Sequence, residues 1–162
     1  MGACLSLRGS EAELLRKRSL EFLIEAEHAL RRGSYDVACF LAEQSLQLYL
    51  RHVLLKVVGD YPRTHSIRHL LGEVARVAGS REVEDFMRRN RARLLALEDA
   101  YLMARYFTRE YGREDAEDSV RSSRRYLSYS VKYWVRRHEL HRHPTSQGRD
   151  LKELEVMGGE DR

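Results

Sequence analysis

The sequence lacks the features on which sheets, disulfide frameworks and zinc sites depend. Only two of its 162 residues are cysteine and only two are proline. No stretch alternates β-branched with polar residues over a useful length. Two cysteines argue against a disulfide framework and against a structural zinc site, and the missing alternation argues against a sheet. We therefore expect an all-α fold that holds no metal and no cofactor.

Long apolar runs are also missing. No run approaches the roughly 20 apolar residues of a membrane-spanning helix, so we expect a cytoplasmic protein without membrane contact. Asparagine occurs once, and only four of the 29 basic residues are lysine. Such an arginine-rich, amide-poor composition is compatible with a thermophilic source. The net charge of +4 is too small to predict nucleic-acid binding by itself.

The stretch from Ser34 to Val58 is the feature around which the chain is organised. It contains no glycine and no proline, and apolar residues recur every three to four positions on a wide face. A helix with so wide an apolar face must be buried by neighbours on more than one side. Ser34 is a favourable N-cap whose hydroxyl can accept from first-turn amides, and Gly59 stands where a left-handed residue would end the helix. The stretch predicts the central helix of a bundle.

Four further helices are predicted around this central one. They span about residues 10–32, 66–78, 81–107 and 115–140. Ser10 is expected to cap the first helix, and a bend is expected near 90–93, where apolar residues lapse. The buried stripe of the first helix is expected to consist of Leu14, Leu15, Phe22, Ala26, Ala29 and Leu30. Short connections favour antiparallel neighbours, so residues 10–140 predict an up-and-down bundle of four main antiparallel helices plus one short helix. Residues 141–162 lack sustained periodicity and predict a flexible tail.

Several short stretches, taken in order, resemble the HEPN domain family. They are Gly33–Ala38 (GSYDVA), Leu41–Leu48 (LAEQSLQL), Thr64–Ile67 (THSI) and Tyr101–Tyr106 (YLMARY). The last is similar to the family's Tyr-x-x-x-Arg-Tyr-Pro, with Phe107 in place of the proline. The resemblance covers about residues 10–138, and it rests on the order and spacing of the stretches.

The resemblance implies a homodimer with a role connected to nucleotides or RNA, often beside a minimal nucleotidyltransferase partner. Some members are metal-independent ribonuclease toxins of toxin–antitoxin pairs that use an Arg-x(4–6)-His motif. There the imidazole moves the 2′-OH proton and the guanidinium stabilises charge on the phosphate. No histidine stands four to six residues after Arg105. We therefore expect a non-catalytic nucleotide/RNA-binding or interaction module without catalytic residues, and the ribonuclease toxin is the alternative.

Two candidate binding positions lie outside the last helix. Arg105 and Tyr106 end the predicted helix 81–107, where Arg105 is expected either to pair with a carboxylate or to contact a phosphate. His65 lies in the loop before helix 66–78. It is expected either to tie this loop down or to belong to a nucleotide site.

The last predicted helix carries tyrosines beside cations. The candidate RNA-binding residues are Arg121, Arg125, Tyr129, Lys132, Tyr133 and Arg136, with Tyr126 on the same strip as the other tyrosines. Rings beside cations can stack bases and hold phosphates. The alternatives are that the tyrosines cover a dimer interface or that the charges form a solvated face.

Overall fold

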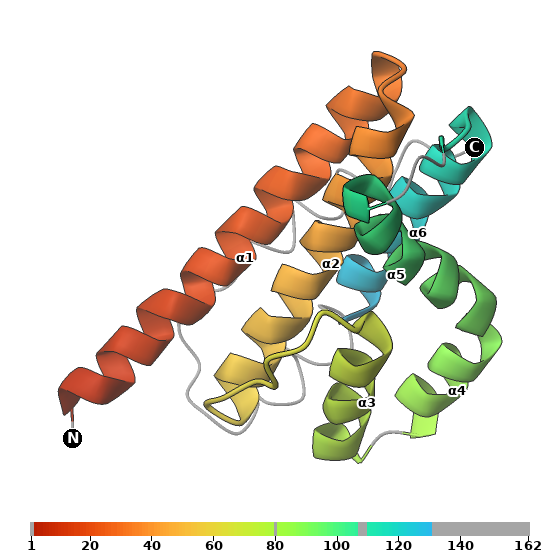
Figure 1. The fold of residues 1–162 in the computed structure, drawn as a ribbon. Coiled ribbons are helices and arrows are strands. Elements are labelled where there is room, and N and C mark those ends of the chain that lie inside the picture. The colour runs from red at the N-terminus through yellow and green to blue at the C-terminus, as the bar shows by residue number, and fades with distance from the viewer. Residues whose placement is uncertain (1, 80, 107–109, 131–162) are drawn as a thin grey trace.

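The computed structural model describes residues 2–79, 81–106 and 110–130, and within these ranges it contains six α-helices and no strand (Figure 1). The helices are α1 (Gly2–Arg31), α2 (Tyr35–Val57), α3 (Ile67–Ala78), α4 (Arg81–Arg89), α5 (Arg91–Tyr106) and α6 (Arg113–Ser130). The predicted all-α class is confirmed, with six helices where five were expected. None of the described helices is both long enough and apolar enough to cross a bilayer.

The central position of α2 is confirmed. It contacts α1, α3, α5 and α6, and α1 lies beside it along its length (Figure 1). Leu46, Leu50 and Leu54 are almost completely buried in the core that these helices share. Gly59 adopts a φ of 85° after the helix, the left-handed conformation that was predicted for it. The wide apolar face is therefore covered on several sides.

The predicted N-cap of α2 is confirmed in its position but not in its side-chain hydrogen bond, and the predicted N-cap of the first helix is wrong. Ser34 precedes α2 but makes no side-chain cap hydrogen bond, and its hydroxyl instead accepts from Arg32 Nε at 3.3 Å. Ser10 lies inside α1, which begins at Gly2. The residues before Ser10 include no proline, and serine costs only a few tenths of a kcal/mol in a helix interior, so nothing local ends the helix there.

The predicted core-facing stripe of α1 is confirmed at Leu15, Ala26 and Ala29 and is wrong at Leu14. Leu14 is 44% exposed, whereas Ala12, Leu15 and Leu23 are buried. Ser19 lies on this stripe and exchanges two hydrogen bonds of 2.8 Å with Ser45 of α2, each hydroxyl donating to the other residue's carbonyl. Small polar residues at this crossing satisfy each other and let the two helices approach closely.

The helix predicted over 81–107 is divided at Asn90. The Asn90 side chain donates to the Phe86 carbonyl at 2.8 Å, the same carbonyl that accepts from the Asn90 backbone at 3.1 Å. Asparagine side chains compete with the helix ladder in this way, so the predicted bend is confirmed as a boundary between α4 and α5. The helix predicted from residue 115 begins at Arg113, and residues 131–162, including the expected tail, lie outside the described residues.

Candidate functional site

A row of polar side chains on α2 holds the loop that precedes α3. Glu43, Gln47 and Arg51 follow one another at four-residue spacing and so share one face of the helix. Gln47 Nε2 donates to a Glu43 carboxylate oxygen and to the His65 carbonyl, the latter at 3.0 Å. Arg51 Nη2 donates to Gln47 Oε1 and to the Thr64 carbonyl, both at 2.8 Å. The backbone of residues 64 and 65 is thereby fixed to the central helix.

Glu43 begins this row and is fully buried. Its other carboxylate oxygen accepts from Gln44 Nε2 at 2.7 Å. Burial raises the pKa of the Glu43 carboxyl to about 7, although the amides of Gln47 and Gln44 and the charge of Arg51 favour its ionised form. The row therefore includes a carboxyl that titrates near neutral pH.

A second carboxylate, Glu98 of α5, holds the other side of the same loop. Glu98 Oε1 accepts from the Ser66 hydroxyl at 2.7 Å and from the Arg68 backbone at 2.8 Å. Glu98 Oε2 pairs with Arg68 Nε at 2.7 Å. A carboxylate at a helix N-terminus is favoured by the helix dipole, so Glu98 positions the start of α3 against α5.

Three aromatic rings form a column beside this loop. His65 stacks on Tyr101 of α5 with centroids 4.7 Å apart and an interplanar angle of 15°. Tyr101 in turn stacks on Phe40 of α2 at 6.4 Å and 20°. Phe40 and Tyr101 are half-buried, whereas His65 is exposed. We call His65, Tyr101 and Phe40 the aromatic column.

Arginines from two helices surround a small cleft between α5 and α6. Its cavity has a volume of about 60 Å³. It is lined by Asn90, Arg93, Asp118, Arg121, Ser122, Arg125 and Tyr126. Arg93, Arg121 and Arg125 are exposed, and Arg93 approaches the single carboxylate of the lining, Asp118, at 3.8 Å. We call this the basic cleft, because its lining includes three arginines and one carboxylate.

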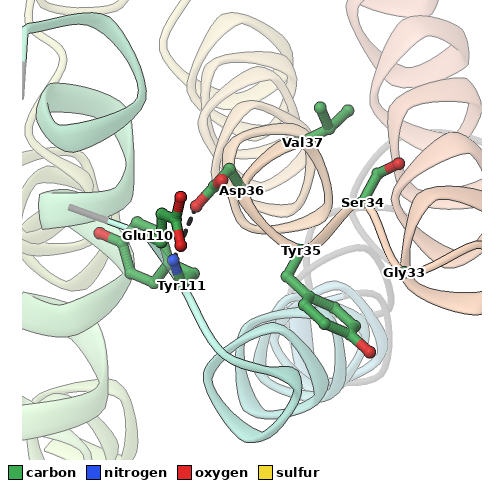
Figure 2. Close-up of a pocket in the computed structure, with 7 residues that line it drawn as sticks. All are labelled: Gly33, Ser34, Tyr35, Asp36, Val37, Glu110 and Tyr111. Atoms are coloured by element: carbon green, nitrogen blue, oxygen red, sulfur yellow. Dashed lines mark hydrogen bonds between the residues drawn. The ribbon is translucent and has the colours of Figure 1, made fainter. Parts of the chain in front are cut away.

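A larger cavity, of about 330 Å³, lies where α1 turns into α2 (Figure 2). Its lining is Gly33, Ser34, Tyr35, Asp36, Val37, Glu110 and Tyr111. Figure 2 shows Asp36 reaching the segment 110–111, where its carboxylate accepts from the Tyr111 backbone at 2.7 Å. The lining carries two carboxylates and no cation, so its charge disfavours a phosphate ligand.

A family model described as the HEPN domain matches residues 12–134, which include α2 to α6 and most of α1. The chain belongs to the HEPN family. No curated protein matches the sequence significantly.

Two solved structures share the HEPN fold of this chain. The crystal structure of TT1696 from Thermus thermophilus is 23% identical, with a TM-score of 0.62, over 75% of this chain and 97% of that one. The crystal structure of ST0689, an archaeal HEPN homologue, is 24% identical, with a TM-score of 0.58, over 75% and 96%. At this identity the likeness shows the fold alone.

The HEPN bundle brings some of the predicted site residues together. Arg121 and Arg125 lie together at the basic cleft, joined by Arg93, which was not among the predicted site residues. Arg93 lies within the predicted bend, and only the packing of α5 on α6 makes it part of the cleft. His65 lies in a loop that is held in place, and the residue is exposed. The two expectations stated for it, that it ties the loop down and that it belongs to a nucleotide site, are therefore compatible.

The proposed tyrosine strip is partly wrong, because Tyr126 is buried. Only 3% of this residue is exposed, and its ring meets Phe86 edge-on at 4.8 Å. Tyr126 therefore belongs to the core and cannot stack a base. The side chains of Tyr129, Arg105 and Tyr106 lie outside the described part of the chain, as do residues Lys132, Tyr133 and Arg136 altogether.

The described residues gather no group of three or more histidine, cysteine, aspartate or glutamate side chains that could hold a metal ion. Cys39 is buried in α2, and burial raises the pKa of its thiol to about 11. A thiol in this state is a poor nucleophile at neutral pH.

Proposed function

We propose that this HEPN protein is a non-catalytic module that binds RNA or nucleotides through their phosphates at the basic cleft. The observation that carries the proposal is the meeting of Arg93, Arg121 and Arg125 across two helices around one cavity. A guanidinium presents its donors in a planar fork that matches a phosphate, and it keeps its charge at every physiological pH. Membership of the family supports the proposal by analogy only.

The size of the basic cleft favours a phosphate over a base. A volume of about 60 Å³ is far below the roughly 300 Å³ at which pockets for drug-sized ligands begin. The cleft therefore has room for the oxygens of one anionic group, while a base would lie outside it. Asp118 neutralises part of the charge through Arg93, which leaves Arg121 and Arg125 as the main phosphate ligands.

Equilibrium binding of a fluorescent single-stranded RNA, followed by anisotropy at fixed salt, tests this proposal. Arg121→Ala/Arg125→Ala should weaken binding at least about tenfold, because each charged contact contributes on the order of 1 kcal/mol. The matched control is Arg18→Ala/Arg31→Ala, which removes two exposed arginines from α1. Equal losses in the two double variants would show that net charge, and not the basic cleft, determines binding.

A homodimer and a minimal nucleotidyltransferase partner complete the proposal. Both come from the family likeness of the sequence. Light scattering on the purified protein tests the dimer, and co-purification with a small nucleotidyltransferase produced from the same operon tests the partner. A monomer that co-purifies with no such enzyme would remove this part and leave the basic cleft untouched.

The non-catalytic assignment is tested separately. No histidine stands four to six residues after Arg105, so the motif of the ribonuclease members is missing at that place. RNA incubated with the protein in EDTA should stay intact, and Arg105→Ala should change nothing. Cleavage that depends on Arg105 would establish the ribonuclease alternative.

A further inference from the structure

The aromatic column ends in the exposed residue His65, which contacts with α2 and α5 hold in place. Its three members come from α2, the loop before α3 and α5, so the stack forms only in the folded bundle. Gln47 donates a hydrogen bond to the His65 carbonyl, and Arg51 donates one to the Thr64 carbonyl. An imidazole that only sealed the loop would gain most from burial, yet His65 is exposed.

A fixed, exposed ring is what base stacking requires. Stacking on an aromatic side chain stabilises bound single strands with little dependence on sequence. Because the His65 backbone is already ordered and its ring already lies flat on Tyr101, little conformational entropy remains to be lost on binding. Arg63, two residues earlier in the loop, is exposed and supplies positive charge nearby.

The column and the basic cleft are separate places on α5. Tyr101 and Arg93 are eight residues apart, which corresponds to about 12 Å along the helix axis and roughly 80° around it. The Tyr101 side faces α2 and the loop before α3, whereas the Arg93 side faces α6. A mononucleotide is too short to fill both places, while a longer strand can reach both.

We infer that His65 is the open end of a stacking platform for one unpaired base of RNA, with Tyr101 and Phe40 beneath it. The inference rests on the proposed function, because it assigns a base subsite to the same ligand. It assigns the larger purine bases as the favoured occupants, since they cover more of the imidazole.

The probe for this platform is an oligouridine RNA of about twelve nucleotides with one central 2-aminopurine, a length within the usual site sizes of single-strand binders. Stacking quenches 2-aminopurine fluorescence, so the platform predicts quenching on binding. His65→Ala should abolish the quenching and weaken binding at least about fivefold. His65→Phe should restore both. His69→Ala, which removes another exposed imidazole, four residues later in α3, should behave as the wild type.

The outcomes separate this inference from the proposed function. If His65→Ala binds and quenches like the wild type while Arg121→Ala/Arg125→Ala binds weakly, the platform is wrong and the basic cleft stands. If only the His65 variant is impaired, the platform stands and the cleft is wrong. If the wild type binds no RNA, both are wrong. Circular dichroism of each variant confirms that the fold is kept.

Discussion

The buried carboxyl of Glu43 should make the stability of the protein depend on pH in a specific window. In the unfolded chain this carboxyl titrates near 4.5, and in the folded protein burial raises its pKa to about 7. Between these values the folded state holds a proton that the unfolded state has released. The free energy of unfolding therefore falls as the pH rises through this window.

The size of this effect follows from the two pKa values. The difference between 4.5 and about 7 corresponds to roughly 3 kcal/mol, which is lost in full above about pH 7. Glu43→Gln cannot ionise and loses none of it. The unfolding free energy of the variant relative to the wild type should therefore rise by roughly 3 kcal/mol between about pH 4.5 and about pH 8.

The comparison with the variant removes other titrations from the measurement. Burial lowers the pKa of His52, so the His52 contribution has the opposite sign and increases stability as the pH rises towards the ordinary histidine value. That contribution is present in both proteins and cancels in the difference. An amide at position 43 also changes the hydrogen bonds with Gln44 and Gln47, but this offset does not vary with pH.

Denaturant unfolding at a series of pH values measures the difference directly. Glu84→Gln, which removes an exposed carboxyl from α4, serves as the matched control and should give a difference that stays flat. A flat difference for Glu43→Gln as well would refute the reasoning, because it would mean that Glu43 ionises in the folded protein as easily as in the unfolded chain.

Two further predictions concern packing and the start of α3. Leu46→Ala should cost about 2–5 kcal/mol of unfolding free energy because Leu46 is fully buried, whereas Leu14→Ala should cost at most about 0.5 kcal/mol. If denaturant unfolding gave comparable losses for the two variants, Leu14 would not lie outside the core-facing stripe of α1. Glu98→Gln should cost about 1.5–3 kcal/mol of unfolding free energy, since it removes the charged acceptor of Ser66 and Arg68. It should also speed amide hydrogen exchange in the first turn of α3. Unchanged exchange there would show that α3 does not need this carboxylate.

The parts of the fold that local pattern determines could be predicted from the sequence. The apolar face of residues 34–58 is wide enough to require several neighbours, and α2 has them. The lack of apolar residues near 90–93 marked the boundary between α4 and α5 that the Asn90 side chain creates. Errors arose where two local signals compete. The hydroxyl of Ser34 was expected to accept from first-turn amides, but it meets Arg32. Leu14 was placed on the buried stripe of α1, but it is exposed.

The candidate site was harder to predict because its parts are distant in the sequence. Arg121 and Arg125 are one turn apart on a single helix, so their pairing was visible, but Arg93 joins them only through the packing of α5 on α6. His65 and Tyr101 are likewise brought together by tertiary structure. Tyr126 was grouped with Tyr129 and Tyr133 on one strip beside the core face. It follows the core-facing Ser122 and Ser123 at helical spacing and is buried with them.

The salt dependence of RNA binding tests the central claim most directly. Each phosphate neutralised on a single strand contributes about −0.7 to the slope of log K against log salt concentration. Removing Arg121 and Arg125 together should therefore make the slope less steep by about 1.4, measured between about 50 and 200 mM salt. A slope that stays the same as that of the wild type would show that RNA phosphates do not bind at the basic cleft.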